Sequence, residues 1–320
     1  MKREMMTNPW QNLIKPLRNG SYSAILANKD SVLKFYWAID FYENKIFLLQ
    51  LSQEVQKIKN IEEILGIKIV FDVVNGTQQL SFILSDLANE DIFYLICSDL
   101  LEKTKSIENE QKAIEVLLYR LDSWRKFLKS KRKALDKRGI IGLVGELYFL
   151  KKELFPKFGI KESLSFWQAP LQEKQDFIVH NSAIEVKTRG TQNKITISSF
   201  EQLNSELENL YLYVLTITQS SEILDNSINV FEFIDNLKKQ IVSEDIELLL
   251  EFERLLLEYG YIHLPSLENF TIFVGQHTVY KVIDDFPKIS ILPLGVEQLV
   301  YRINLDICEK FEKLAIEYKG

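Results

Sequence analysis

A segment near the middle of the chain most constrains the fold: two short, mainly apolar runs meet at a turn signal. The runs are 176–179 and 183–187, and Asn181-Ser182 lies between them. Short apolar runs on either side of a turn predict two antiparallel strands. Side chains alternate between the faces of a strand, so Glu185 and Lys187 share one face. The pattern therefore places two charged side chains on a strand that is otherwise apolar.

Charged side chains on a buried strand are costly unless they are paired or functional. Asp176 opens the first run, and strand pairing would bring its carboxylate toward Glu185. Two converging carboxylates can hold a hard divalent cation such as Mg²⁺. Such a cation activates water and neutralises charge on a phosphodiester, and Lys187 would orient or help deprotonate that water. The residues thus suggest phosphodiester hydrolysis.

Each of these residues also has a purely structural interpretation. Asp176 would then cap a turn, and Glu185 and Lys187 would form an exposed pair. A slip of the hairpin by one residue would turn Glu185 and Lys187 away from the site. The joint occurrence of the three residues favours a functional site.

Asp176 followed nine positions later by Glu185-Val186-Lys187 resembles the PD-(D/E)XK nuclease superfamily, with Gln175 in place of the proline that can precede the aspartate. The resemblance extends to Glu146, within Gly-Leu-Val-Gly-Glu-Leu, where the superfamily often has another acidic metal ligand. It also extends to Gln202, where several branches carry a supporting glutamine. The resemblance implies a catalytic set of Glu146, Asp176, Glu185, Lys187 and Gln202, in which the three acids bind Mg²⁺, with Mn²⁺ as a substitute.

Further motifs narrow the resemblance. Trp167, Leu294-Gly295-Val296 and Tyr301 are similar to positions in a group of PD-(D/E)XK proteins found in bacterial restriction and phage-defence loci. The strongest resemblance covers about 139–210. It implies a restriction-endonuclease-like core, in which a mixed sheet is flanked by helices, and double-stranded DNA as the substrate.

The length of 320 residues favours two domains, and 46% apolar with 26% charged residues excludes disorder as the main state. We expect an α+β or α/β protein. Residues 1–125 should form a β-rich domain, with an antiparallel meander and connecting helices. Residues 126–320 should form the nuclease-like core with a C-terminal extension.

Periodicity also predicts individual elements of the second domain. A helix from Leu143 to Phe155 should stop at Pro156, and a helix beginning at Ser198 or Ser199 should carry Gln202. Strands are expected at 270–274 and 279–283. Glycines recur at 139, 142 and 145, but the GK[ST] ending of a phosphate loop is absent. Two interpretations of the glycines are left: close packing of the helix on the sheet, or close approach of the backbone to a DNA phosphate.

The chain carries a net charge of −6, yet 125–138 contains eight basic residues and one acid. This run is either a solvated helix face or a phosphate contact. For the second case, the residues expected to meet DNA phosphates are Arg189, Lys194, Lys131, Arg132, Lys133, Lys137 and Arg138.

Together these observations predict a Mg²⁺-dependent DNA endonuclease of a restriction or anti-phage system. The alternative is a non-catalytic or partner-dependent DNA-binding subunit on the same scaffold. Cutting both strands with one site per chain favours a homodimer, and other defence-system subunits are possible partners. Two isolated cysteines, no signal peptide and no membrane-length apolar run favour the cytoplasm.

Overall fold

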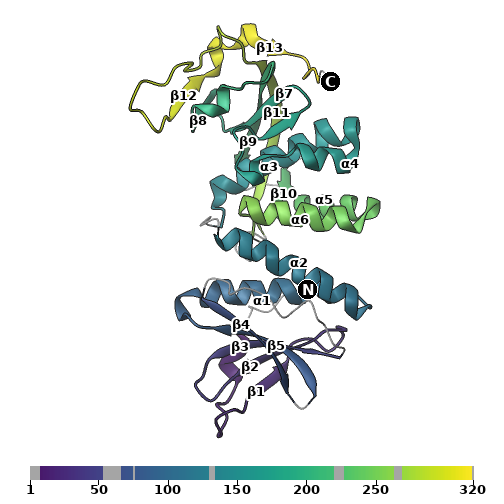
Figure 1. Cartoon of the computed structure of the whole chain (residues 1–320). Coiled ribbons are helices and arrows are strands. Elements are labelled where there is room, and N and C mark those ends of the chain that lie inside the picture. Colours follow the sequence, from purple (N-terminus) through teal and green to yellow (C-terminus); the bar gives the residue numbers. More distant parts are fainter. Residues whose placement is uncertain are drawn as a thin grey trace. The chain divides into compact units, whose positions relative to one another are not determined.

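The computed structural model describes residues 8–52, 66–74, 76–129, 134–219, 227–262 and 269–318. The chain divides into two compact units, Met1–Arg132 and Lys133–Gly320, and each is described by itself (Figure 1). In the described ranges, none of the helices has the length and apolar character needed to cross a membrane.

The first unit contains a five-stranded antiparallel sheet with the order β1-β2-β3-β5-β4. The predicted simple meander is wrong in one respect, because β3 pairs with β5 rather than with β4. The reason is burial: β5 is buried along its second half and takes the interior position, whereas β4 is mostly exposed and takes the edge. The strands are β1 (Ser23–Leu26), β2 (Lys34–Ile39), β3 (Lys45–Leu51), β4 (Ile67–Val74) and β5 (Thr77–Leu84).

Helices follow this sheet in the chain. Asp86 caps the first of these segments, because its Oδ1 accepts a hydrogen bond from Ala88 N at 3.0 Å. A buried polar cluster joins the two long helices: Arg120 Nε and Nη2 each donate to Asp99 at 2.9 Å, and Trp124 Nε1 donates to Asp99 at 2.8 Å. The segments are η1 (Pro9–Asn12), η3 (Leu87–Asn89), α1 (Glu90–Thr104) and α2 (Glu110–Lys129).

The second unit is built on a mixed sheet with the order β10-β11-β9-β7-β6, and β13 pairs with β11. β7 runs parallel to β9, and the other pairs are antiparallel. This confirms the predicted α+β class with a mixed-sheet core. The strands are β6 (Phe177–Val179), β7 (Ser182–Arg189), β9 (Asn209–Gln219), β10 (Ser227–Asn229), β11 (Thr271–Lys281) and β13 (Glu312–Lys313).

One long strand, β11, replaces the two strands predicted at 270–274 and 279–283. Its pairing with β9 shifts register between Val274 and His277, so the chain passes the irregularity without leaving the sheet. Gly275 lies there, and a Cβ at this position would come within 3.3 Å of the Thr216 Cβ. The gap expected between the two strands is therefore a bulge within one strand.

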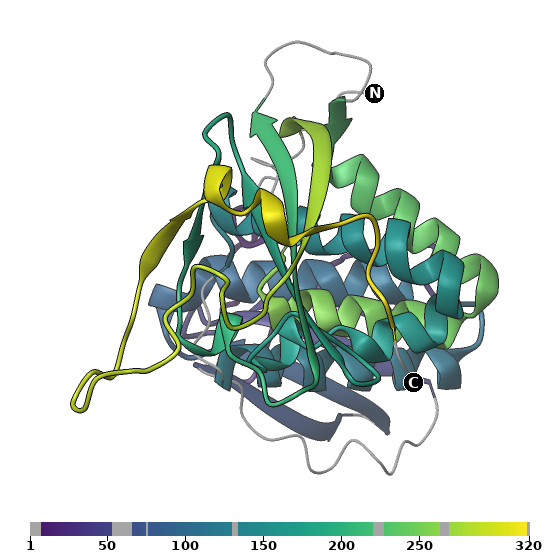
Figure 2. The same ribbon diagram turned by 90° about the horizontal axis from the view of Figure 1, so that it is seen from above.

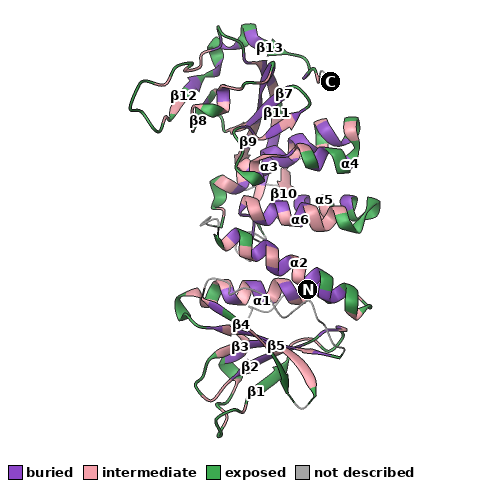
Figure 3. Cartoon of the chain, in the orientation of Figure 1, coloured by how far each residue is buried: buried purple, intermediate pink, exposed green. Residues whose placement is uncertain are grey.

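Helices cover one face of this sheet and bury the larger core, which appears purple in Figure 3. They are α3 (Lys137–Phe149), the π-helical turn η4 (Leu150–Leu154), α4 (Phe155–Phe166), α5 (Val230–Glu244) and α6 (Ile246–Tyr259). The expected stop at Pro156 is wrong. The helical chain continues past it to Gly159, whose φ of +74° breaks the helix. The wider π turn, in which Phe155 N–H donates to Leu150 O, accommodates the proline.

A second core lies on the other face of the sheet, under a two-stranded antiparallel pair of β8 (Lys194–Ile197) and β12 (Tyr301–Asn304). Short 3-10 segments complete this side: η5 (Ala169–Leu171), η6 (Glu201–Leu203), η8 (Leu305–Ile307) and η9 (Glu309–Phe311). η6 replaces the longer helix predicted after Ser199. Asn204 ends it, because its Nδ2 donates to Phe200 O at 2.7 Å and to Ile289 O at 2.9 Å.

Candidate active site

The β6–β7 hairpin sets the geometry of the site. Phe177 pairs with Ile184 and Val179 with Ser182, so the predicted antiparallel pairing is present. The turn lies one residue earlier than predicted, because Ser182 already belongs to β7. Continuing the register by one residue places Asp176 opposite Glu185. The three residues of the motif are thus brought to the same end of one hairpin.

The backbone of β7 holds the carboxylate of Asp176. Val186 N donates a 2.8 Å hydrogen bond to Asp176 Oδ2. Burial raises the pKa of Asp176, and the Lys187 ammonium and the Val186 N–H oppose that rise. The backbone contact orients this side chain before any ligand binds.

Glu185 and Lys187 form an ion pair with one carboxylate oxygen left over. Lys187 Nζ lies 2.5 Å from Glu185 Oε1. The other oxygen, Oε2, is buried and has no hydrogen-bond partner among the described residues. Burial, with the nearby charge of Asp176, raises the pKa of Glu185 to about 8 even though Lys187 opposes this. Burial disfavours the Lys187 ammonium, but the surrounding carboxylates outweigh it and raise the pKa of Lys187.

The third acid, Glu146, comes from α3, which packs closely against β7. A Cβ on Gly145 would lie 2.5 Å from Thr188 Cγ2, so only glycine permits this approach. This contact supports the prediction that the glycine repeat packs the helix on the sheet. Gly142 has more space, since a Cβ there would be 3.9 Å from the Tyr259 hydroxyl.

Two aromatic donors occupy both carboxylate oxygens of Glu146. Trp167 Nε1 donates to Oε2 at 2.7 Å, and the Tyr259 hydroxyl donates to Oε1. The rings of Trp167 and Tyr259 stack with centroids 5.8 Å apart. Burial, followed by the charge of Asp176, raises the pKa of Glu146 well above its usual value, although the two donors oppose this rise. Glu146 is thus held in place on the helical side of the site.

The carboxylates of Glu146, Asp176 and Glu185 are the groups that would hold a divalent cation. No group of three or more acidic, histidine or cysteine side chains within the described ranges is arranged to hold a metal ion as it stands. The chemistry of the donors nevertheless fits: Glu185 has a buried oxygen, Oε2, without a partner, the charge of Asp176 acts on Glu185, and carboxylate oxygens are the ligands that Mg²⁺ prefers. Glu146 would have to exchange one of its aromatic donors to join them.

The remaining predicted residues are dispersed. Gln202 lies on η6, and its Oε1 accepts a 2.7 Å hydrogen bond from Ser198 N, so its amide oxygen stabilises the local turn. Lys137, Arg138 and Lys194 are exposed and Arg189 is half-buried. Lys131, Arg132 and Lys133 lie outside the described residues.

Sequence reasoning missed Tyr259 and the backbone N–H of Val186. Tyr259 is 113 residues from Glu146 in the chain. It ends the amphipathic helix α6, where the sequence pattern predicts an ordinary core residue. No local pattern marks it. Trp167, which the sequence marks only through the family resemblance, is buried and contacts Glu146.

A mixed sheet flanked by helices, with Asp176 and the Glu185–Lys187 pair meeting on one hairpin, is typical of the PD-(D/E)XK nuclease-like class. Residues 6–306 match a family model described as "Putative PD-(D/E)XK family member" (DUF4420), and the chain belongs to this family. No curated protein and no solved structure matches the chain. The resemblance to the PD-(D/E)XK superfamily is thereby confirmed.

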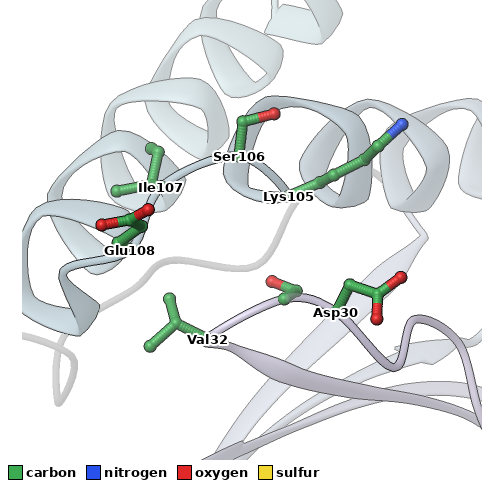
Figure 4. A pocket seen from close by; sticks show the side chains of 7 residues that line it. Asp30, Val32, Lys105, Ser106, Ile107 and Glu108 are labelled. Carbon is green, nitrogen blue, oxygen red and sulfur yellow. The ribbon is translucent and has the colours of Figure 1, made fainter.

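A shallow pocket of about 440 Å³ belongs to the first unit rather than to this site (Figure 4). The loop between β1 and β2 and the turn between α1 and α2 line it. Its side chains have mixed charge, including Asp30, Lys105 and Glu108. We therefore place the candidate chemistry at the carboxylates of the second unit.

Proposed function

We propose that the protein is a Mg²⁺-dependent DNA endonuclease. One observation carries the proposal: in a chain of the PD-(D/E)XK family, Lys187 pairs with one oxygen of a buried Glu185 and leaves the other oxygen without a partner. A buried carboxylate oxygen with no partner is costly in a protein that has no use for it.

Each side chain has a distinct role in this proposal. Asp176, oriented by Val186 N–H, and Glu185, through Oε2, would hold the cation. When bound, Mg²⁺ would supply Lewis-acid activation and neutralise negative charge at the phosphate. Lys187 would orient the attacking water and offset charge that develops on the phosphate oxygens. Its contact with Glu185 Oε1 keeps the ammonium at the site.

The alternative metal, the substrate, the biological setting and the oligomeric state in this proposal follow from the sequence and from the proposed nuclease activity. Mn²⁺ would replace Mg²⁺, because both take oxygen ligands. Double-stranded DNA is the proposed substrate, in a restriction or anti-phage setting in the cytoplasm. A homodimer would bring one site to each strand. The first unit would contact DNA, a partner protein or a second copy.

The test is cleavage of plasmid and phage DNA by the purified full chain in Mg²⁺, Mn²⁺ or EDTA. We expect cleavage that requires the metal and that falls at least a hundredfold in Lys187→Ala and in Asp176→Ala. Lys161→Ala, which removes an exposed lysine of α4, is the matched control and should retain full activity. Equal cleavage by Lys187→Ala and the control would contradict the proposed site.

The contacts of Glu146 favour a second candidate function. Because Trp167 and Tyr259 already occupy both of its oxygens, one acid of the expected metal set is engaged elsewhere. The scaffold would then bind DNA or assemble with other subunits, and cleavage would be absent or would need a partner. A gel shift with duplex DNA, without cleavage in any metal, would support this second function over the first.

A further inference from the structure

The strands β8 and β12 belong to an arm of the second unit, formed by residues 190–197 and 283–304 and called here the β8–β12 arm. The segment before β12 projects away from the sheet and helices of its unit in both views (Figures 1 and 2). None of the residues proposed to hold the metal or orient the water lies in this arm, and Lys194 is the arm residue expected to contact a DNA phosphate.

The outer face of the β8–β12 strand pair is basic and polar. β8 alternates between exposed and buried positions, with Lys194 and Thr196 exposed. On β12, Arg302 and Asn304 are exposed, and they pair with Thr196 and Lys194 respectively. Side chains of paired residues lie on the same face of a sheet. This face therefore presents two cations and two neutral hydrogen-bonding groups, without a carboxylate.

The tip of the arm is apolar. Val296 N donates to Pro293 O at 3.1 Å, and Gly295 with φ +85° closes a tight turn that places Leu294 at the corner. Leu294 is fully exposed, and Ile291 is 81% exposed. Clustered exposed apolar side chains on a projecting turn mark a contact surface.

We propose that the β8–β12 arm docks on duplex DNA, with Lys194 and Arg302 on backbone phosphates and Leu294 inserted as a wedge between bases in the minor groove. The charge of the outer β8–β12 strand face argues for this occupant, because polyanionic DNA matches the two cations that Lys194 and Arg302 present there. Leucine is one of the side chains that minor-groove proteins insert between base steps. The inference rests on the proposed function, and it names the surface that holds the substrate.

The position of the arm along the chain is compatible with this role. Lys194 follows Lys187 by seven residues, so their Cα atoms are at most about 25 Å apart. That is less than one turn of duplex DNA, which rises about 34 Å. Four acids lie in or beside the arm, away from the four exposed strand positions. Asp284, Asp285 and Glu297 are exposed in the segment before β12, and Asp306 accepts a hydrogen bond from Asn193 at 2.5 Å.

The experiment measures binding of a fluorescent 30-base-pair duplex to the full chain in EDTA, where the proposed cleavage does not operate. Arg302→Ala and Lys194→Ala should each weaken binding several-fold and reduce the slope of log affinity against log salt by about 0.9. Leu294→Ala should weaken binding about tenfold without changing that slope, and should remove an increase in 2-aminopurine fluorescence that reports unstacking.

Matched controls come from the same unit. Lys161→Ala removes an exposed cation outside the arm, and Leu314→Ala removes a fully exposed leucine outside it. Binding by wild type with arm variants equal to these controls would overturn the docking surface and leave the nuclease proposal standing. No binding of duplex DNA by the wild type would count against both. Loss of a dimer in Leu294→Ala, with DNA affinity unchanged, would assign the tip to a second copy and overturn the proposal.

Discussion

The indole Nε1 of Trp167 donates a 2.7 Å hydrogen bond to Glu146 Oε2, which ties the end of α4 to the last turn of α3. With the Tyr259 hydroxyl on the other oxygen, this contact surrounds a buried acid with hydrogen-bond donors. Such a cage lets the protein keep a carboxylate near Asp176 and Glu185 at a tolerable cost in folding free energy. It also makes Glu146 a residue whose variants should separate stability from function.

Glu146→Gln should preserve the fold, because the amide oxygen can accept from Trp167 and the amide nitrogen can donate to the Tyr259 hydroxyl. Its free energy of unfolding should stay within about 1 kcal/mol of wild type or exceed it. Glu146→Ala should lose about 2–4 kcal/mol, because it leaves both donors unpaired and creates a cavity. Urea denaturation measures both values. Equal losses in the two variants would show that the carboxylate, not its hydrogen bonds, stabilises this region.

Gly145→Ala should destabilise the protein by about 1–3 kcal/mol, because its Cβ would lie 2.5 Å from Thr188 Cγ2 and push α3 from β7. Gly142→Ala is the matched control on the same helix. It has only an ordinary contact at 3.9 Å and should stabilise by about 0.5–1 kcal/mol through helix propensity. Thr188→Ser removes the clashing methyl group and should rescue Gly145→Ala in a double-mutant cycle. Additive effects of the two substitutions would contradict this contact.

Mn²⁺ should raise the melting temperature of the wild type, because a cation that binds only the folded site stabilises it. At a hundredfold excess over its Kd, the gain is about 2.7 kcal/mol. Glu185→Gln should abolish the shift, since it removes the negative charge of the carboxylate whose Oε2 has no partner. Glu162→Gln, an exposed residue of α4, should retain it. EDTA should reverse the shift, and a shift of equal size in Glu185→Gln would place the cation elsewhere.

Asp99→Ala should destabilise the first unit by about 3–5 kcal/mol, because it leaves the buried Arg120 charge without its bidentate partner. Glu102→Ala offers a contrast on the same helix. It removes an exposed pair with Lys105 and should cost no more than about 1 kcal/mol. Chemical denaturation followed by far-ultraviolet circular dichroism would measure both losses, because Trp124 itself donates to Asp99 and its fluorescence would change with the substitution. Similar losses of unfolding free energy in the two variants would show that burial of the ion pair does not decide its contribution to stability.

The hairpin that carries Asp176, Glu185 and Lys187 could be predicted because its information is local. Apolar runs and a turn signal specify two strands, and the two-residue period puts Glu185 and Lys187 on one face. The mixed sheet with its helices was implied by the resemblance to the PD-(D/E)XK superfamily. The glycine repeat likewise indicated close helix packing, which Gly145 makes against Thr188.

The errors occur where local signals compete with packing. Pro156 normally ends a helix, but a π turn before it lets the chain continue to Gly159. Gln202 was expected on a helix facing the site, whereas Asn204 ends the short η6 turn that carries it and Gln202 bonds to Ser198. In each case a specific hydrogen bond, visible only in three dimensions, outweighed the propensity.

By itself, the sequence determined the β6–β7 hairpin, the motif and the family, because strand period and turn chemistry depend on neighbouring residues. Tertiary structure alone decided that Tyr259 and Trp167 enclose Glu146, and that Glu185 keeps one oxygen without a partner. Such contacts join residues far apart in the chain, and they form only when the whole core packs. Their partners are therefore set by the shape of the fold rather than by any local pattern of residues.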